Sequence, residues 1–280
     1  MSETKHLLDS KQMAFFAANG YLRFDELVPS HLNEAMVAGM EAGEPKRMKA
    51  GTPLSEIWQD RCPAGQVFRM PEVEGIIHSL VGPNPLYDHH AVHIVEPGTE
   101  TGQVWHGDAI IDTRLHFDIQ FFYFAHDTPR EMGGTMILPG SHYRRINEGD
   151  ISRYQNFKGQ LPMVCRAGTL AVVHHGMWHC AQPNLTNDVR SMFKLRLNPT
   201  VRQMRLWNTE DLDDPKVNEI LGSAHAWTGM EHRLEYINRI KFWRFLLGDE
   251  SFDLNYWMSR IENMPEDDRV AACRIDSHRR

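Results

Sequence analysis

The segment WHGDA at 105–109 brings a histidine and a carboxylate close together in the chain, as His106 and Asp108. On a β-strand, where side chains alternate, both would point to the same face. With one further histidine they would form a two-histidine, one-carboxylate facial triad, which holds Fe(II) and leaves coordination positions open. The pattern alone is weak, because His116 and Asp118 repeat the same spacing, so the context must supply the third ligand.

The candidate for the third ligand is His179. It follows an apolar strand candidate at 170–173 and a turn, and a polar loop then leads to the next strand candidate, which Arg190 opens. A histidine at such a strand end can complete the site begun by His106 and Asp108. A guanidinium near the metal binds a carboxylate bidentately, which suits a dicarboxylic co-substrate.

Two neighbouring histidines, His174 and His175, compete for the third position. The spacing of His175 and His179 would place both rings on one face of a helix, as in zinc-dependent hydrolases. The residues between them lack the glutamate that such enzymes use as a base, and Gly176 disfavours a helix. We therefore assign His174 and His175 to packing or to supporting hydrogen bonds. A zinc-dependent hydrolase that uses His175 and His179 stays as an alternative.

Composition narrows the classes of partner. The chain has 280 residues, a net charge of -7 and 41% hydrophobic residues, which is ordinary for a globular protein with a sizeable core. The negative charge argues against nucleic acid and leaves small-molecule chemistry open. No stretch approaches the roughly 20 apolar residues of a membrane helix, and the start shows no secretory signal. Four scattered cysteines favour a reducing compartment, so we expect a cytoplasmic protein.

The chain divides into zones of different pattern. Up to about residue 80 it is mainly helical, with Ser10 and Ser30 as helix caps, Gly20 as a helix end and a short strand candidate at 21–24. The segment Glu44–Gly65 is rich in Pro, Gly and Lys, so we expect a mobile loop. Either this loop and the carboxy-terminal helices form a lid or the loop is a solvated surface segment, and both interpretations stay open. After about residue 86 the pattern changes to short β-rich runs.

The second zone, about 86–200, predicts a sandwich or barrel of short strands separated by turns. In 116–124 apolar and polar residues alternate, and we expect one face of this run to border the pocket. From about 207 to 264 the chain returns to helix. Over 229–248 the residues at helical spacing are Met230, Leu234, Ile237, Ile240 and Leu247. Since no flexible linker separates the zones, a single domain over 1–280 is expected, with helical parts at about 1–80 and 207–264.

Longer motifs carry a resemblance to a known family. HGD at 106–108, DTPREMGGTMILPGSH at 127–142 and WHCAQPNLTNDVR at 178–190 occur in the order seen in the phytanoyl-CoA dioxygenase family of Fe(II)/2-oxoglutarate-dependent oxygenases. FFAANGYLRFDELVPS at 15–30 is similar to the amino-terminal segment of that family. The resemblance spans most of residues 10–200, and the ordered combination is more specific than any of its parts.

The resemblance implies a mainly β fold with flanking helices, a double-stranded β-helix or jelly roll. It implies that His106, Asp108 and His179 ligate Fe(II), and that Arg190 binds the distal carboxylate of 2-oxoglutarate. The remaining assignments concern secondary contacts. By match to similar enzymes, Gln103 and Thr135 would also contact this co-substrate, His142 would shape a turn, and Gly107 and Ala181 depart from the residues often found there.

The family's reaction consumes 2-oxoglutarate and O2, releases succinate and CO2, and hydroxylates or otherwise oxidises an unactivated C–H bond. Related halogenases replace the carboxylate ligand with a small residue, so the retained Asp108 indicates hydroxylation or another oxidation. No basic cluster suggests a site for the phosphates of CoA, and a free small molecule is expected as substrate. We also expect hydrogen bonds to the far ring nitrogens of His106 and His179. A non-catalytic jelly-roll binding module is the second alternative.

Overall fold

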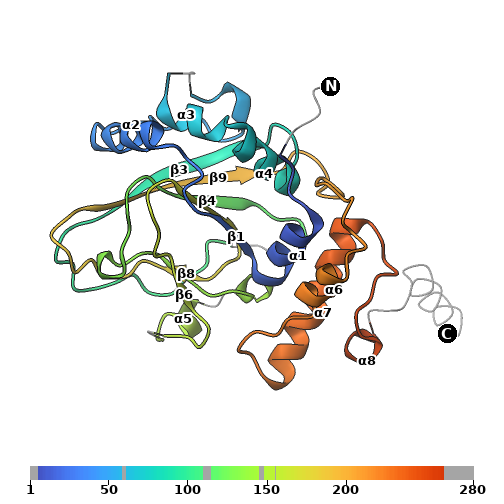
Figure 1. Cartoon of the computed structure of the whole chain (residues 1–280). Coiled ribbons are helices and arrows are strands. Elements are labelled where there is room, and N and C mark those ends of the chain that lie inside the picture. The colour runs from blue at the N-terminus through green and yellow to red at the C-terminus, as the bar shows by residue number, and fades with distance from the viewer. Residues whose placement is uncertain (1–5, 59–60, 110–114, 145–147, 155, 262–280) are drawn as a thin grey trace, which may run out of the picture.

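Two antiparallel sheets and the helices around them form the described part of the chain (Figure 1). The computed structural model describes residues 6–58, 61–109, 115–144, 148–154 and 156–261. The larger sheet has the strand order β1-β7-β4-β9-β3-β2, and the smaller has the order β6-β5-β8. This architecture confirms the predicted jelly roll with flanking helices.

The strands are β1 (Tyr21–Phe24), β2 (Thr52–Pro53), β3 (Leu86–Val95), β4 (Ile119–Phe124), β5 (Met136–Ile137), β6 (Leu161–Pro162), β7 (Thr169–His174), β8 (His179–Cys180) and β9 (Arg190–Asn198). The α-helices are α1 (Ser10–Asn19), α2 (Ser30–Glu41), α3 (Pro63–Phe68), α4 (Pro71–Val81), α5 (Glu148–Ile151), α6 (Pro215–Leu221), α7 (Gly229–Leu247) and α8 (Tyr256–Ser259). The 3-10 helices are η1 (Leu54–Glu56), η2 (Arg130–Met132) and η3 (Ser141–Tyr143).

Strands β4 and β7 of the larger sheet are buried along their whole length. In β4 the side chains of Ile119, Phe121 and Tyr123 join a large hydrophobic cluster shared with the helices, whereas Phe122 and Phe124 join a smaller cluster on the inner face. The predicted alternation is therefore present, but regular strand begins only at Ile119. A strand that is covered on both sides has a continuous apolar sequence, because neither face meets water.

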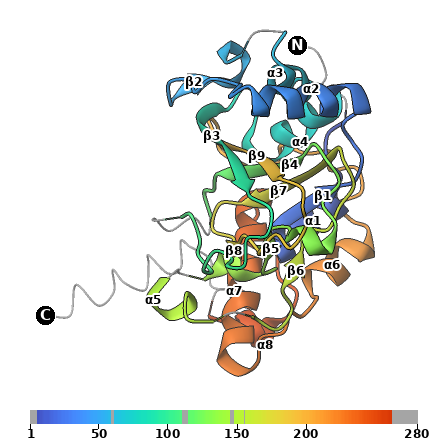
Figure 2. The same ribbon diagram turned by 90° about the vertical axis from the view of Figure 1, so that its left-hand side faces the viewer.

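The helices cover the outer face of the larger sheet. Helices α1, α2, α3, α4, α6 and α7 all contribute side chains to the large cluster, together with Phe193, Leu195 and Leu197 of β9. Figures 1 and 2 show α2 and α3 at one end of the molecule and α6 and α7 at the other. The inner face is left to the smaller sheet and the loops between strands, which is where the predicted ligands lie.

The predicted helix caps need a small correction. Asp9, not Ser10, is the N-cap of α1 and forms a capping box, because its side chain accepts a backbone N–H one turn into the helix. Ser30 is likewise the first helical residue of α2 rather than its cap. Gly20 ends α1 as predicted, with φ 79°, and a Cβ there would lie 2.4 Å from Nδ1 of His142. Only glycine fits that position.

The segment Glu44–Gly65 packs on the outer side of the sheet. It contains β2, η1 and the start of α3, and the ring of Trp58 lies 6.2 Å from that of Tyr87 and 5.8 Å from that of Phe193. Phe193 belongs to the outer cluster, so the described part of this segment lies away from the inner face. These contacts do not support the predicted lid; residues 59–60 lie outside the described residues.

The predicted long helix near the carboxy terminus is α7, which ends at Gly248 in the left-handed conformation. Its buried side differs from the prediction. Met230 and Leu234 are 87% and 44% exposed, whereas Glu235 and Arg239 are buried and pair with each other at 2.6 Å. The predicted apolar positions fail at the start of the helix because an ion pair, which hydropathy cannot reveal, occupies the buried positions there.

Parts of three predictions lie outside the described residues: the ends of the proposed 1–280 domain, the last residues of the helical part at 207–264, and Cys273. Cys62, Cys165 and Cys180 are free. Among the residues that the structure describes, none of the helices combines the length and the apolar character needed to cross a bilayer.

Candidate metal centre

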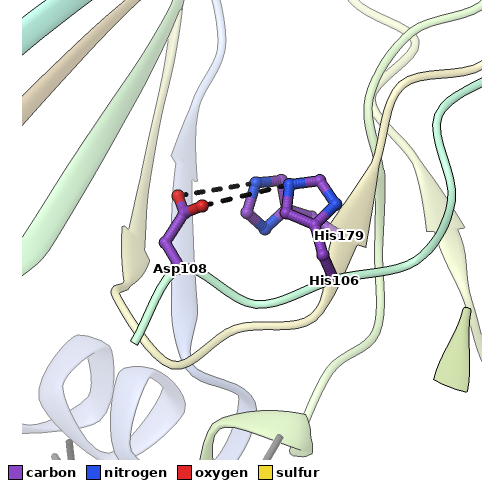
Figure 3. Close-up of side chains that lie close together, drawn as sticks. All are labelled: His106, Asp108 and His179. Atoms are coloured by element: carbon purple, nitrogen blue, oxygen red, sulfur yellow. Dashed lines mark ion pairs between the residues drawn. The ribbon is translucent and has the colours of Figure 1, made fainter. Parts of the chain in front are cut away.

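His106 and His179 are brought together by a single antiparallel bridge. The backbone N–H of each donates to the carbonyl of the other, at 3.1 and 2.9 Å, and the ring centroids lie 4.4 Å apart. Asp108 then faces both rings, with Oδ1 3.9 Å from Nε2 of His106 and Oδ2 3.7 Å from Nε2 of His179 (Figure 3). His106 and Asp108 do not share a regular strand, contrary to the prediction, yet the three predicted ligands converge.

The far nitrogens of both rings are held by backbone carbonyls, as predicted. Nδ1 of His106 lies 2.9 Å from the carbonyl oxygen of Val104, and Nδ1 of His179 lies 3.0 Å from that of Met177. A carbonyl only accepts, so Nδ1 carries the proton in each ring and Nε2 presents its lone pair on the side of Asp108. One ligand atom from each of the three residues lies within 4.8 Å of the other two.

The donor set fits a reactive metal ion better than a structural one. Two imidazole nitrogens and one carboxylate are the set that holds Fe(II) with positions left open, whereas structural zinc sites are closed by four protein ligands. Burial lowers the pKa of His179 to about 4, so its ring is neutral at neutral pH. A three-ligand site, which leaves metal positions open, argues against the alternative of a non-catalytic binding module.

Lys194 is a neighbour of Asp108 that the sequence analysis missed. Its Nζ lies 3.2 Å from Oδ2 of the carboxylate. Burial alone would raise the pKa of Asp108, but the neighbouring His179 ring, together with the charge and the hydrogen bond of Lys194, holds that pKa well below its usual range. The carboxylate is therefore ionised at neutral pH, ready to ligate a cation.

A cavity of about 280 Å³ opens beside the triad. The triad itself lines it, as do the three predicted co-substrate residues Gln103, Thr135 and Arg190. Arg190 opens β9, is 1% exposed and donates to the carbonyl of Gly133. Burial lowers the pKa of Arg190 to about 10, which leaves the guanidinium charged at neutral pH. A buried cation in the same cavity as a metal site is positioned to bind an anionic ligand.

The two remaining predicted co-substrate contacts, Gln103 and Thr135, differ in the hydrogen bonds that their polar groups already make within the protein. Oε1 of Gln103 accepts the backbone N–H of Ala181 at 3.3 Å. Among the described residues, the hydroxyl of Thr135 donates to the thioether sulfur of Met192, at 3.6 Å, which is a weak acceptor. The structure thus brings both residues to the cavity, with the Thr135 hydroxyl the less engaged of the two.

The competing histidines lie elsewhere. His174 accepts the backbone N–H of Gly176 at Nδ1 and stacks on Phe117 with ring centroids 5.2 Å apart, so it packs in the core. His142 lies in η3, 5.0 Å between ring centroids from His174, in keeping with a turn-shaping role. Within the described residues, the cluster of three metal-ligating side chains does not include His175. The zinc alternative built on His175 and His179 is therefore not supported.

Fold and site together define a jelly-roll protein with an open two-histidine, one-carboxylate centre beside a buried arginine. The family model described as phytanoyl-CoA dioxygenase (PhyH) matches residues 16–192, and the chain belongs to this family. It is an enzyme of the iron- and 2-oxoglutarate-dependent oxygenase type. No curated protein matches the chain.

Several solved structures share this fold. The chain is similar to the non-heme α-ketoglutarate-dependent carbocyclase SnoK from nogalamycin biosynthesis, with 18% identity and a TM-score of 0.52 over 68% of this chain and 84% of that one. It is also similar to HygX from Streptomyces hygroscopicus with nickel and 2-oxoglutarate bound, with 14% identity and a TM-score of 0.54 over 72% and 90%. The epimerase SnoN in complex with Fe3+, α-ketoglutarate and nogalamycin RO follows, with 16% identity and a TM-score of 0.52 over 67% and 82%.

Proposed function

We propose that this protein is an Fe(II)- and 2-oxoglutarate-dependent dioxygenase that hydroxylates or otherwise oxidises an unactivated C–H bond of a small molecule, releasing succinate and CO2. The observation that carries the proposal is the shared cavity. Three metal-ligand atoms within 4.8 Å of one another border the same space as the buried, charged Arg190. A metal site with open positions and a carboxylate-binding cation in one cavity suit a dicarboxylic keto acid that chelates the metal.

Each residue has a role in this proposal. His106, Asp108 and His179 hold the iron, and Arg190 binds the distal carboxylate of 2-oxoglutarate. When bound, iron with 2-oxoglutarate and O2 supplies oxidising chemistry that no amino-acid side chain can provide. The chain itself supplies orientation: backbone carbonyls fix both rings, and Lys194 keeps the carboxylate ionised.

Two secondary contacts complete the co-substrate site. Thr135 offers its hydroxyl, whose partner in the described part of the chain is a weakly accepting thioether. Gln103 offers the amide N–H groups left after its carbonyl accepts from Ala181. Both side chains line the cavity together with Arg190. We expect each to contribute less to 2-oxoglutarate binding than Arg190, because neither carries a charge.

The substrate is proposed to be a small molecule, in the cytoplasm. A net charge of -7 disfavours nucleic acid, and the free Cys62, Cys165 and Cys180 suit a reducing compartment. SnoN, which shares the fold, was solved with nogalamycin RO, a small molecule. The oxygenase proposal is compatible with a range of oxidations, since SnoK is a carbocyclase and SnoN is an epimerase.

Anaerobic titration with Fe(II) and 2-oxoglutarate tests the proposal directly. The wild-type protein should develop the visible charge-transfer band of the iron–keto-acid chelate. His179→Ala should lose it, because one of three ligands is gone, while His232→Ala, at a partly exposed position of α7 that is not among the three clustered ligands, serves as the matched control and should keep it. A wild-type protein without the band, or a full band in His179→Ala, would contradict the proposal.

A further inference from the structure

Strand β9 carries a basic residue at each end of its inner face. Arg190, Met192, Lys194 and Arg196 alternate along it, and the first three line the co-substrate cavity. At about 3.3 Å per residue, Arg190 and Arg196 lie roughly 20 Å apart along the strand. Lys194, which contacts Asp108 at 3.2 Å, sits between them. The metal centre therefore has Arg190 on one side and the Arg196 end of the sheet on the other.

The Arg196 end carries four polar side chains, which we call the inner polar group: Asp118, Gln120, His175 and Arg196. Gln120 of β4 is in register with Arg196, and the guanidinium of Arg196 donates to Asp118 Oδ2 at 2.6 Å. His175 follows the end of β7, and its backbone N–H donates to the carbonyl of Asp118 at 3.0 Å. The metal ligand Asp108 lies within electrostatic reach of His175.

Two members of this group are buried without hydrogen-bond partners in the described structure. Gln120 is 0% exposed and neither its amide nitrogen nor its amide oxygen is bonded; His175 is 2% exposed and neither ring nitrogen is bonded. Buried polar groups are nearly always paired, because an unpaired one loses its hydrogen bonds to water and forms none in their place. Two such side chains in one inward-facing group, beside Arg196 and two residues along β9 from the lysine that contacts Asp108, indicate that a bound molecule pairs with them.

The charges of the group define what it can bind. Arg196 is balanced by Asp118 and, at 4.0 Å, by Asp88, and Lys194 is balanced by Asp108. Burial lowers the pKa of His175 to about 4, so its ring is neutral and offers one donor and one acceptor. Gln120 adds an acceptor and two donors. No uncompensated cation is left in this group for a phosphate or a carboxylate.

We propose that the inner polar group is the substrate-recognition subsite, and that Gln120 and His175 bind an uncharged molecule rich in hydroxyl or amide groups rather than an acyl-CoA or a fatty acid. The inference rests on the proposed function, since it places this molecule on the side of the metal opposite Arg190. Gln120 and His175 act as specificity-determining residues that orient the molecule toward the open metal positions.

The first test measures thermal unfolding of the full chain without iron or ligand, for Gln120→Leu, His175→Leu and the matched control His232→Leu. If the amide and ring are unpaired in the free protein, Gln120→Leu and His175→Leu should each raise Tm by roughly 3 °C, because an apolar group of similar size removes an unpaired buried polar one. The Tm of the control His232→Leu should equal that of the wild type. If either substitution lowers Tm instead, that side chain has internal structural partners and the proposal is overturned.

The second test measures binding by the same iron-free proteins. A set of neutral glycosides, polyols and amides is compared with a set of acyl-CoA thioesters and fatty acids, by thermal shift and then by equilibrium dialysis. We expect binders from the neutral set, at least tenfold weaker in Gln120→Leu and unchanged in His232→Leu. Binders from the acyl-CoA and fatty-acid set alone, no binder in the neutral set, or equal binding in Gln120→Leu would each overturn the proposal.

A separate measurement keeps this result apart from the oxygenase proposal. The iron–2-oxoglutarate band should be unchanged in Gln120→Leu, since Arg190 and the three ligands are intact. Absence of the band in the wild-type protein would contradict the proposed function but would leave the iron-free binding data unchanged. A normal band with no neutral binder would defeat the subsite alone.

Discussion

One carboxylate oxygen of Asp108 faces two nitrogen atoms, the ammonium of Lys194 and a ring nitrogen of His179. Its Oδ2 lies 3.2 Å from Nζ of Lys194 and 3.7 Å from Nε2 of His179. In Lys194→Met the partly buried carboxylate of Asp108 loses its compensating charge, so the metal-free protein should lose about 2 kcal/mol of stability. Fe(II) would then no longer meet an ammonium group, so the rise in Tm on adding Fe(II) anaerobically should be larger than in the wild type.

The matched control for this prediction is Lys216→Met. Lys216 pairs with Glu219 on the exposed surface of α6, where an ion pair contributes little, so both its metal-free Tm and its response to iron should stay near the wild-type values. Equal metal-free stability in Lys194→Met and Lys216→Met would show that Lys194 does not compensate Asp108.

Arg190 gives a prediction on the co-substrate side. In Arg190→Gln the bidentate, charge-assisted partner of the distal carboxylate is lost, and the affinity for 2-oxoglutarate should fall about 100-fold. Affinity for Fe(II) alone should change little, because Arg190 is not one of the three ligands. Titration of the chelate band with each component separately distinguishes the two. A parallel loss of iron affinity would mean that Arg190 supports the fold of the centre instead.

The site residues that could be predicted from the sequence are those for which the required chemistry allows few residue types. His106, Asp108, His179 and Arg190 stand out because metal and carboxylate binding admit few alternatives at a given place in a motif. Lys194 could not be recognised in this way, since a lysine in a β-rich run usually faces solvent. Its role follows from the register of β9 against β4, which pairs it with the inward-facing Phe122.

At the scale of elements, polar contacts anchor α1 to the chain after β9, and the carboxylate of Asp211 takes part in two of them; Lys11 also pairs with Asp214 at 3.1 Å. Asp211 accepts the backbone N–H of Ser10 at 2.8 Å and pairs with Lys11 at 3.0 Å. Burial alone would raise its pKa, but the hydrogen bonds from Ser10 and Lys11 and the charge of Lys11 lower the pKa of Asp211 to about 2. A carboxyl group with a depressed pKa in the folded state stabilises the protein above its unfolded pKa and loses that contribution as pH falls.

The stability difference between the wild type and Asp211→Asn should therefore depend on pH. Above about pH 5 the variant should be less stable by on the order of 2 kcal/mol, and the difference should shrink as pH falls from about 4 to about 2. Denaturant unfolding at a series of pH values measures it. Asp213→Asn, at an exposed neighbour, should stay within about 0.5 kcal/mol at every pH. A constant difference down to pH 2 would exclude a role for the ionised carboxylate.

Elements were predictable where one pattern repeats long enough. The runs that became α1, β4, β9 and α7 follow helical or alternating spacing over many residues, and β7 is a continuous apolar run. The two-residue strands β5, β6 and β8 have no periodicity to detect, because pairing with neighbours far along the chain defines them. His106 and Asp108 illustrate the same limit: one bridge to His179 positions them, where a strand was predicted.

At the scale of the whole molecule, both helical flanks share one hydrophobic cluster with the larger sheet. A buried polar network adds to this contact. Glu235 of α7 pairs with Arg239 and His225, and His225 reaches Oδ1 of Asn19, the last residue of α1, at 3.0 Å. We propose that the described chain folds as one domain, since these contacts tie the carboxy-terminal flank to the amino-terminal one.

Glu235→Gln tests this proposal. The substitution keeps the shape of the side chain but removes the charge that compensates Arg239, and both residues are 2% exposed, so stability should fall by about 3 kcal/mol. If the flanks and the sheet form one cooperative unit, thermal unfolding should keep a single transition, with Tm lower by roughly 5–10 °C. Glu219→Gln, on the exposed side of α6, is the matched control and should change Tm little. Two separate transitions, with only the first shifted, would show that α7 unfolds independently of the larger sheet.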